Sequence, residues 1–288
     1  MKALLATFSL LLSSAPSFSA DGTPPVFLNH FYIAVDQLTY DALRKSPEIA
    51  ALAGIEERHT VAGSRSWSGF YVYGRQTYME FFAADTLPDG TPKEDCGLGL
   101  SVEKAGGVAA IATRLRTIFG DKVEIDKQVR TISTGDIPWY VAAAVDTDAP
   151  QAMETWVMEV DPSYLAAMHP GSLVKHPLSR EQYLSWNFLP DRLLDAVVGI
   201  RAALNSVEMT RLANELELIG WSVHREGGGF HAKGPDAELE VIPAGSRMGI
   251  QQVDLRLQRS VAKRTIGLGS AKFLLDGKTG QLIFWTTE

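Results

Sequence analysis

Hydrophobic and polar residues alternate along Phe27–Val35, a segment that reads FLNHFYIAV. An alternation with a period of two predicts a β-strand with two distinct faces. Phe31 and Ile33 share the face that we expect to point into the core. His30 and Tyr32 share the opposite face, where a polar side chain must meet solvent, a ligand or a hydrogen-bond partner.

The pattern then changes to a helix and returns to strands. A helical stretch begins at Thr39, and Pro47 either bends this helix or splits it in two. Strands are predicted at Glu56–Val61 and in the aromatic hairpin Gly69–Phe82, whose turn falls at 74–76. The first unit therefore has the order strand, helix, three strands.

The same order of elements appears twice more. The second copy is predicted as a strand, an amphipathic helix and three strands at 97–102, 107–119, 123–132, 138–145 and 155–160. In the third copy a strand at 194–204 precedes a helix capped by Asn205 and Glu208, and three strands follow at 221–224, 230–233 and 237–243. The remainder, 249–286, begins with a strand and is predicted to end in a hairpin over FLLDGKTGQLIFW, as a degenerate fourth copy.

Repetition of a βαβββ unit predicts an α+β fold, with three full copies plus a degenerate fourth. Such a unit makes a curved sheet with its helix on one face, and its concave face requires a partner unit, so that paired units enclose a cleft with the helices outside. We therefore expect a first domain at 24–161 and a second, partly degenerate domain at 193–288. The Pro-rich segment 162–192 is predicted to be a connector over the surface or across a cleft.

The N-terminus has the pattern of a secretory signal peptide. Lys2 precedes the apolar stretch Ala3–Leu12, and small residues follow up to Ala20. This pattern predicts a signal peptide over 1–19, cleaved after Ser19, and export to the periplasm or out of the cell. No other segment is long and apolar enough to span a bilayer.

Composition excludes several classes of partner and site. The formal net charge of -7 argues against nucleic acid and against an anionic membrane surface. Cys96 is the only cysteine in the sequence, which excludes an internal disulfide and a cysteine-rich metal site. The hydrophobic fraction of 45% is typical of a globular protein whose core alone must hold it together. The oligomeric state is left open.

One acid interrupts the second strand of the aromatic hairpin. Glu80 shares its face with Tyr78 and Phe82. A carboxylate in such a setting needs a counter-charge, a metal ion or a raised pKa. The functional interpretation places Glu80 in a cleft, and the alternative is an ion pair with Arg75 or Arg65.

Aromatic residues near Glu80 are candidates for the wall of a ligand pocket. The predicted ligand-binding residues are Tyr32, Trp67, Tyr71, Tyr78 and Arg65. Arg65 lies in a polar segment, AGSRSWSG, of the kind that closes over ligands. The alternatives are aromatic rings packed in the core and an arginine exposed to solvent.

The opening strand LNHFYIAV, the strand TYMEFF and its counterpart TWVMEV resemble those of the vicinal oxygen chelate superfamily, which includes glyoxalases and extradiol dioxygenases. More closely, FLNHFYIAVD, SWSGFYVYGRQTYMEFF and REQYLSWNFLPDRLLDAVVGI look like an uncharacterised glyoxalase-like family with no assigned reaction. The superfamily contains isomerases, dioxygenases, thiol transferases and ligand-binding proteins. The resemblance therefore implies the fold and leaves the chemistry open.

The resemblance also implies a metal site. The ligands in metal-dependent members come from the first and fourth strands of paired units, which here gives His30, Glu80 and Glu159 around one divalent ion, with Glu80 or Glu159 as a possible base. The fourth position falls near Gly97 or Leu98, neither of which binds a metal. One nitrogen and two carboxylates remain, close to the 2-His-1-carboxylate pattern with the ratio inverted.

Each ligand candidate has a structural alternative. His30 would be a cleft histidine bonded to a backbone carbonyl, and Glu159 a solvated acid on an edge strand. His169 and His176, in the connector, are exposed loop residues unless one of them reaches the cleft and supplies the missing nitrogen. Acids and an arginine alternate on two strands of the last half and predict a solvated or internally paired face: Glu238, Glu240, Asp254 and Arg256.

Two functions follow from these patterns. The first is an exported, divalent-metal-dependent enzyme of the lyase, isomerase or dioxygenase type, acting on a small oxygen-chelating substrate. The second is a non-catalytic protein that binds a small molecule on the same fold. A structural protein of the cell envelope with filled clefts is a third, weaker hypothesis.

Overall fold

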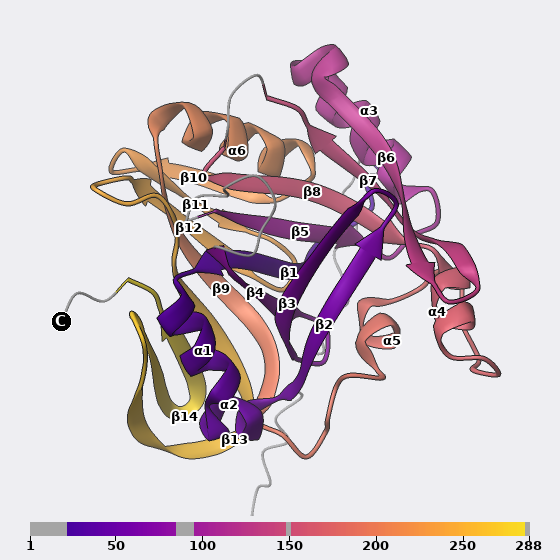
Figure 1. Cartoon of the computed structure of the whole chain (residues 1–288). Coiled ribbons are helices and arrows are strands. Elements are labelled where there is room, and N and C mark those ends of the chain that lie inside the picture. The colour runs from indigo at the N-terminus through magenta and orange to yellow at the C-terminus, as the bar shows by residue number, and fades with distance from the viewer. Residues whose placement is uncertain (1–21, 85–94, 148–150, 286–288) are drawn as a thin grey trace, which may run out of the picture.

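The computed structural model describes residues 22–84, 95–147 and 151–285. Two β-sheets pack face to face, and helices lie around the pair (Figure 1). The predicted signal peptide lies outside the described residues. None of the described helices is long and apolar enough to cross a membrane.

The first βαβββ unit forms as predicted. Its elements are β1 (Val26–Val35), α1 (Gln37–Lys45), α2 (Pro47–Leu52), β2 (Gly54–Ala62), β3 (Arg65–Tyr73) and β4 (Tyr78–Ala83). Pro47 splits the helix in two, because it begins α2 immediately after Ser46, whose side-chain oxygen accepts a hydrogen bond from the backbone N–H of Ile49.

Two further units repeat the same order. The second contains β5 (Cys96–Val102), α3 (Gly107–Phe119), the 3-10 turn Gly120–Lys122, β6 (Val123–Ile132), β7 (Gly135–Val145) and β8 (Met153–Val160). The third contains β9 (Leu194–Leu204), α6 (Ser206–Leu218), β10 (Ser222–Glu226), β11 (Gly229–Lys233) and β12 (Glu238–Pro243). Asn205 caps α6 as predicted, since its side chain accepts from the backbone N–H groups of Val207 and Glu208.

Strand pairing shows how the units combine. Among the described residues the first sheet has eight strands in the order β2-β3-β4-β1-β5-β8-β7-β6, and the second has six in the order β10-β11-β12-β9-β13-β14. Within each unit the first and last strands pair in parallel. Two units then join through an antiparallel pair of first strands, β1 with β5, and β9 pairs with β13 in the same way. The α+β fold of paired βαβββ units is therefore confirmed.

The degenerate fourth copy differs from the prediction. It consists of β13 (Gly249–Leu268) and β14 (Ala271–Ile283), which pair with each other around a turn at Gly269 and Ser270. The predicted hairpin inside FLLDGKTGQLIFW is wrong, because this segment runs through as one strand. Gly277 has φ 58° at a shift of register opposite Val261, so the glycine forms an irregularity in the strand and the chain does not reverse there.

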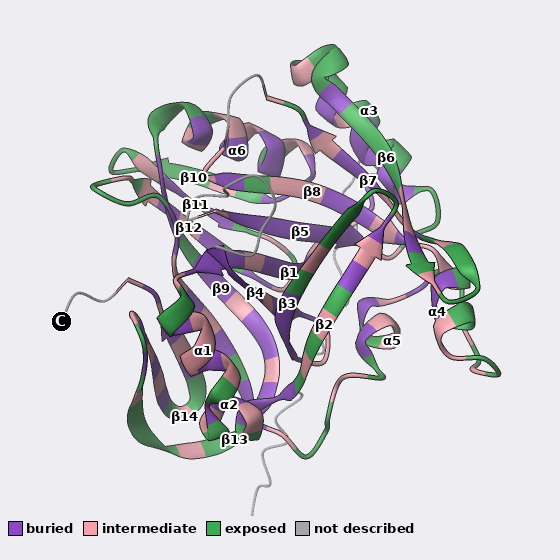
Figure 2. Ribbon diagram, viewed as in Figure 1, coloured by how far each residue is buried: buried purple, intermediate pink, exposed green. Residues whose placement is uncertain are grey.

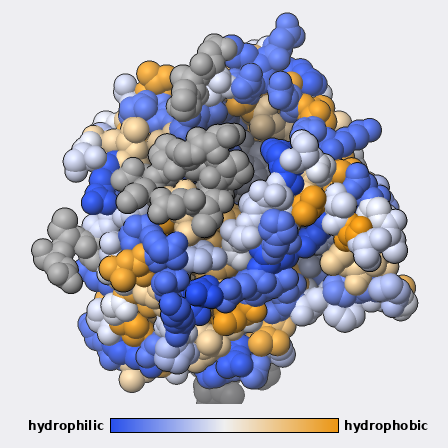
Figure 3. Space-filling view, viewed as in Figure 1, coloured by the Kyte–Doolittle hydropathy of each residue, from blue (hydrophilic) through white to orange (hydrophobic). Residues whose placement is uncertain are grey.

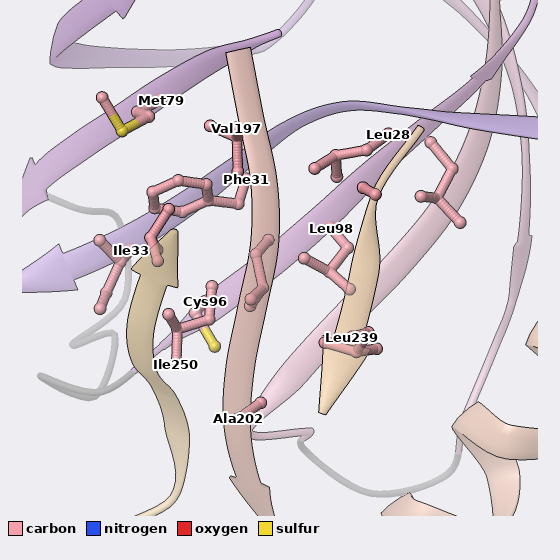
Figure 4. Packing of buried hydrophobic residues seen from close by; sticks show 14 of the residues in the cluster. Leu28, Phe31, Ile33, Met79, Cys96, Leu98, Val197, Ala202, Leu239 and Ile250 are labelled. Carbon is pink, nitrogen blue, oxygen red and sulfur yellow. The ribbon is translucent and has the colours of Figure 1, made fainter. Parts of the chain in front are cut away.

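The hydrophobic core joins the two sheets. Figure 4 shows Phe31 of β1 packed beside Val197 of β9, with Cys96 of β5 near Ile250 of β13. Three neighbouring strands in the middle of the first sheet, β4, β1 and β5, are almost wholly buried, whereas β2 and β6 at its edges carry exposed residues (Figure 2). The convex face of the first sheet thus rests on the second sheet, and its concave face is left for a site.

The connector crosses this concave face. It contains α4 (Pro162–Met168) and α5 (Arg180–Leu184), and Tyr164 and Leu165 of α4 pack against Trp139 and Met158 of the sheet in a second, smaller core. The buried side chain of Arg180 fixes α5, because its Nε donates to Glu103 at 3.0 Å and its Nη1 to the backbone carbonyl of Leu28.

The outer face of the second sheet is polar and internally paired, as predicted. Its pairs are Lys233 with Glu238 at 2.9 Å, Arg201 with Glu240 at 3.4 Å and Arg256 with Asp195 at 2.7 Å, while Asp254 accepts from Gln252 and Gln281. On the side of the molecule shown in Figure 3, hydrophilic side chains also predominate, and hydrophobic ones form small separate groups.

Candidate functional site

His30 lies on the concave face of β1 with its imidazole held in one orientation. The strand is irregular between Leu28 and His30, which brings Asn29 beside the histidine. The Asn29 amide nitrogen donates to the Ser101 hydroxyl at 3.4 Å, so its oxygen accepts from His30 Nδ1–H at 2.9 Å. This chain leaves His30 Nε2 as a hydrogen-bond acceptor that faces the interior of the curved sheet.

Glu80, on β4, faces this nitrogen. Glu80 Oε1 lies 3.9 Å from His30 Nε2. Burial raises the pKa of Glu80 to about 7, against the opposing effect of the Arg58 guanidinium, and burial together with Arg58 lowers the pKa of His30 to about 3. At neutral pH His30 is uncharged, so the two side chains form a polar pair with room for a bridging atom and do not form an ion pair.

The cation near Glu80 is not one of the two arginines expected from the sequence. Arg75 pairs with Asp195 at 3.2 Å, and the exposed Arg65 donates to Gln128 of β6 at 3.0 Å. Arg58, on β2, supplies the positive charge instead. Sequence reasoning missed it because β2 has no hydrophobic alternation to show which of its residues face the interior.

Glu159 lies on the other face of the sheet, away from His30 and Glu80. Its two carboxylate oxygens accept from the backbone N–H of Gly106 at 2.9 Å and of Val108 at 3.4 Å, at the start of α3. The prediction that Glu159 completes a metal site is wrong, because the alignment of β8 with β4 behind it is shifted by one residue. In β8 it is Trp156, opposite Gly99, that corresponds to Tyr78, opposite His30, so Met158 stands where Glu80 stands in β4. A shift of one position turns a side chain to the opposite face.

The fourth ligand position is closed. The residue opposite His30 on β5 is Gly99, whereas the sequence pointed to Gly97 or Leu98. A Cβ on Gly99 would lie closer than 3.0 Å to three atoms of the His30 ring, and a Cβ on Gly97 would collide with the ring of Tyr32. The glycines of GLGLSV therefore make room for two rings, and neither position has space for a ligand side chain.

These residues do not fit a divalent metal ion. His30 and Glu80 offer two donors, and the part of the chain that the structure describes contains no group of three histidine, cysteine or acidic side chains that could hold a metal. His169 does not join them, because its ring stacks on Trp186 in the connector at 4.0 Å. The Arg58 guanidinium, whose charge acts on both His30 and Glu80, adds repulsion to a cation bound between them.

The predicted ligand-binding aromatic residues divide between two roles. Tyr78 stacks on His30 with ring centres 4.5 Å apart and lines a cavity between the concave face and the connector. Tyr71 is buried beneath Arg58 and accepts a hydrogen bond from Trp67 at 3.2 Å, and Tyr32 covers Gly97. Trp67, Tyr71 and Tyr32 thus build the aromatic floor of the concave face and do not line that cavity.

Comparison with known proteins places the chain in a family. A family model described as a family of unknown function, DUF5829, matches residues 28–285. The chain belongs to the DUF5829 family. No curated protein matches the sequence.

Two solved structures resemble this DUF5829 protein at low identity. One is a xylose isomerase-like TIM barrel/4-hydroxyphenylpyruvate dioxygenase fusion protein, with a TM-score of 0.42, 11% identity and coverage of 83% of this chain. The chain spans only 37% of the length of that protein. The other is a mutant of 4-hydroxymandelate synthase from Streptomyces coelicolor, with a TM-score of 0.38, 12% identity and coverage of 79% of this chain and 70% of that one. Similarity this weak assigns no activity to the DUF5829 protein.

A cavity of about 220 Å³ opens between the concave face and the connector. One water molecule takes about 30 Å³ in the liquid, so the cavity has room for a small organic molecule. The sheet contributes Glu56, Arg58, Tyr73, Tyr78 and Arg130 to its wall. The connector contributes Tyr164, Leu165, Met168, His169, Tyr183, Leu184, Trp186 and Asn187.

Arg130 is the most unusual residue of this wall. Its side chain on β6 is buried, with 8% of the residue exposed, and its Nη1 donates to the Tyr164 hydroxyl at 3.0 Å. Its guanidinium lies 5.6 Å from the ring centre of Trp139. Among the residues that the structure describes, no carboxylate lies within ion-pair distance of it. A buried charge without an opposite charge is costly and is rare without a functional reason.

Arg58 differs from Arg130 in having an acidic partner. Its Nη1 donates to Glu56 Oε2 at 3.3 Å and to the Tyr73 hydroxyl at 3.1 Å. Burial lowers the pKa of His169, the remaining basic residue of the wall, so that this histidine is neutral at pH 7. Two guanidinium groups and one carboxylate thus give the cavity wall a net charge of about +1.

Proposed function

We propose that this DUF5829 protein binds a small organic anion in the cavity beneath the connector, and that no metal ion takes part. The observation that carries this proposal is the buried guanidinium of Arg130, which has no carboxylate partner among the described residues. An anion that enters the cavity would supply the missing opposite charge. The N-terminal sequence pattern supports export, so the ligand would be met outside the cytoplasm.

The chemistry of the cavity wall favours a carboxylate with an organic body. A guanidinium presents N–H groups in a planar fork that fits a carboxylate with two parallel hydrogen bonds. Four tyrosines and Trp186 line the same cavity and offer flat apolar surfaces together with hydroxyl groups. A small monocarboxylate satisfies both parts of the wall.

The proposal is tested by calorimetric titration with benzoate, phenylacetate and hexanoate, with benzamide as the uncharged control. We expect benzoate to bind at one site per chain and benzamide not to bind measurably. Arg130→Gln should weaken binding by a factor of about 30 or more, because removing one partner of a buried, hydrogen-bonded charge pair costs about 2–5 kcal/mol.

A matched control separates this effect from a general loss of positive charge. Arg201, paired with Glu240 on the outer face of the second sheet, is changed to glutamine in the same way and should leave the affinity unchanged. Thermal unfolding of each variant shows that it is folded. The proposal falls if none of the three monocarboxylates binds, or if Arg130→Gln binds benzoate as tightly as the wild type.

A metal-dependent lyase, isomerase or dioxygenase-type enzyme is the second candidate. It has one supporting observation, which is that His30 Nε2 and Glu80 Oε1 face each other at 3.9 Å. Elemental analysis of the purified protein distinguishes the two candidates. A stoichiometric metal that is lost in His30→Ala favours the enzyme, and its absence from wild-type protein supplied with divalent metals favours metal-free binding.

A further inference from the structure

Glu56 stands in the wall of the proposed anion site and is itself an anion. Its Oε2 accepts from the Tyr73 hydroxyl at 2.6 Å, from Arg58 Nη1 at 3.3 Å and from the Asn187 amide at 3.4 Å. About one third of its side chain is still exposed, 33%. The carboxylate is therefore fixed by three donors at the surface of the cavity.

The position of Glu56 decides which arginine is available to a ligand. Arg58 Nη1 donates to both Glu56 and Tyr73, and Arg58 Nε donates to Thr60 at 3.2 Å. The charge of Arg58 is offset within the wall, whereas that of Arg130 is not. A ligand in the cavity therefore meets the uncompensated positive charge of Arg130 and, in the same cavity wall, the fixed negative charge of Glu56.

We propose that Glu56 makes the cavity selective for monoanions and rejects dianions. The inference rests on the proposed function, because it assigns the charge selectivity of that same site. A ligand with one carboxylate pairs with Arg130 and leaves the Glu56–Arg58 pair intact. A second carboxylate would have to compete with Glu56 for Arg58, and like charges brought together in a partly buried site repel strongly.

Selectivity distinguishes this role from a merely structural one. If Glu56 only held Tyr73 and Asn187 in place, its replacement would weaken the binding of monoanions and of dianions by the same factor. If Glu56 repels the second charge, its replacement must change the ratio of the two affinities. Benzoate and phthalate are the matched probes, since phthalate is benzoate with one more carboxylate on the ring.

The neighbouring residue provides a control. Glu57 follows Glu56 on β2, is exposed, and pairs with Arg44 at 3.1 Å. Because side chains alternate along a strand, Glu57 points away from the cavity. Glu57→Gln removes the same charge from the same strand and controls for the field of the whole protein.

The experiment measures the affinities of benzoate and phthalate for the wild type, Glu56→Gln and Glu57→Gln. We expect the wild type to prefer benzoate by about tenfold or more. Glu56→Gln should shift the ratio toward phthalate by about tenfold or more, and Glu57→Gln should leave it within about twofold of the wild type.

Failure of this inference is distinct from failure of the proposed function. The inference is overturned if benzoate binds but phthalate binds the wild type equally well, a result that requires no variant. It is also overturned if Glu56→Gln keeps the wild-type ratio. If benzoate and the other monocarboxylates do not bind at all, the proposed function itself is wrong.

Discussion

The imidazole of His30 occupies the space that a side chain at Gly99 would need. The two residues are opposite each other on β1 and β5, and a Cβ on Gly99 would lie closer than 3.0 Å to the ring. In a pair of βαβββ units the first strands are equivalent, yet here one carries the histidine and the other must have no side chain. This asymmetry converts a position expected to hold a metal ligand into part of the packing around His30.

Gly99→Ala should therefore displace His30 and destabilise the protein by about 1–3 kcal/mol, the range for an extra group forced into a packed site. The measurement is chemical denaturation. Gly267→Ala, in β13, is the control, because nothing lies within 4 Å of a Cβ at Gly267. An equal effect of the two substitutions would show that the His30 ring is free to move aside.

Glu159→Gln should weaken the start of α3 without touching the site. The carboxylate accepts from Gly106 and Val108, and losing such a capping interaction costs about 0.5–2 kcal/mol. Benzoate affinity, measured in parallel, should be unchanged. A large loss of benzoate affinity in Glu159→Gln, with an unchanged free energy of unfolding, would show that Glu159 belongs to the binding site.

Glu80 should make stability fall as the pH rises. Its pKa is raised from 4.5 to about 7 in the folded protein, so the unfolded chain loses its proton first. The contribution is fully present below about pH 4.5 and is lost by about pH 7, on the order of 3 kcal/mol in total. His30 acts in the opposite direction, because its lowered pKa costs stability as the pH falls below 6.5.

The measurement for Glu80 is the difference in the free energy of unfolding between the wild type and Glu80→Gln from pH 4 to pH 8. The His30 contribution is present in both proteins and largely cancels. The wild type should lose stability relative to Glu80→Gln across this range. A difference that is independent of pH would mean that Glu80 titrates as an ordinary solvent-exposed acid.

Removal of metal should leave the protein unchanged. Because His30 and Glu80 provide two donors and a third is lacking among the described residues, a chelator such as EDTA should not shift the melting temperature. Added zinc or iron should not raise it either. A shift of several degrees in either experiment would point to a complete metal site.

The fold could be predicted from the sequence because its signals are local. Alternation of hydrophobic and polar residues indicates β1 and β4, and helical periodicity indicates α3 and α6. The repeated order of elements predicts that the units pair. The site could be predicted only in part. His30 and Glu80 were found because each is a polar residue on an aromatic strand, and Glu159 failed because its assignment depended on an alignment that is wrong by one residue.

The remaining site residues could not be found in the same way. Arg130 lies on a polar strand, VEIDKQVRTI, which contains several charged residues. Nothing in this pattern distinguishes Arg130 from the others. Its burial depends on Tyr164, which the connector brings back over the sheet. Arg58 and Glu56 likewise acquire their roles only when the curved sheet and the connector enclose a cavity.

The most direct test is a calorimetric titration of EDTA-treated protein with benzoate, comparing the wild type with Arg130→Gln. We predict one binding site per chain in the metal-free wild type and an affinity at least about 30-fold lower in the variant. Absence of binding until a divalent metal is restored, or equal affinity in the two proteins, would contradict it.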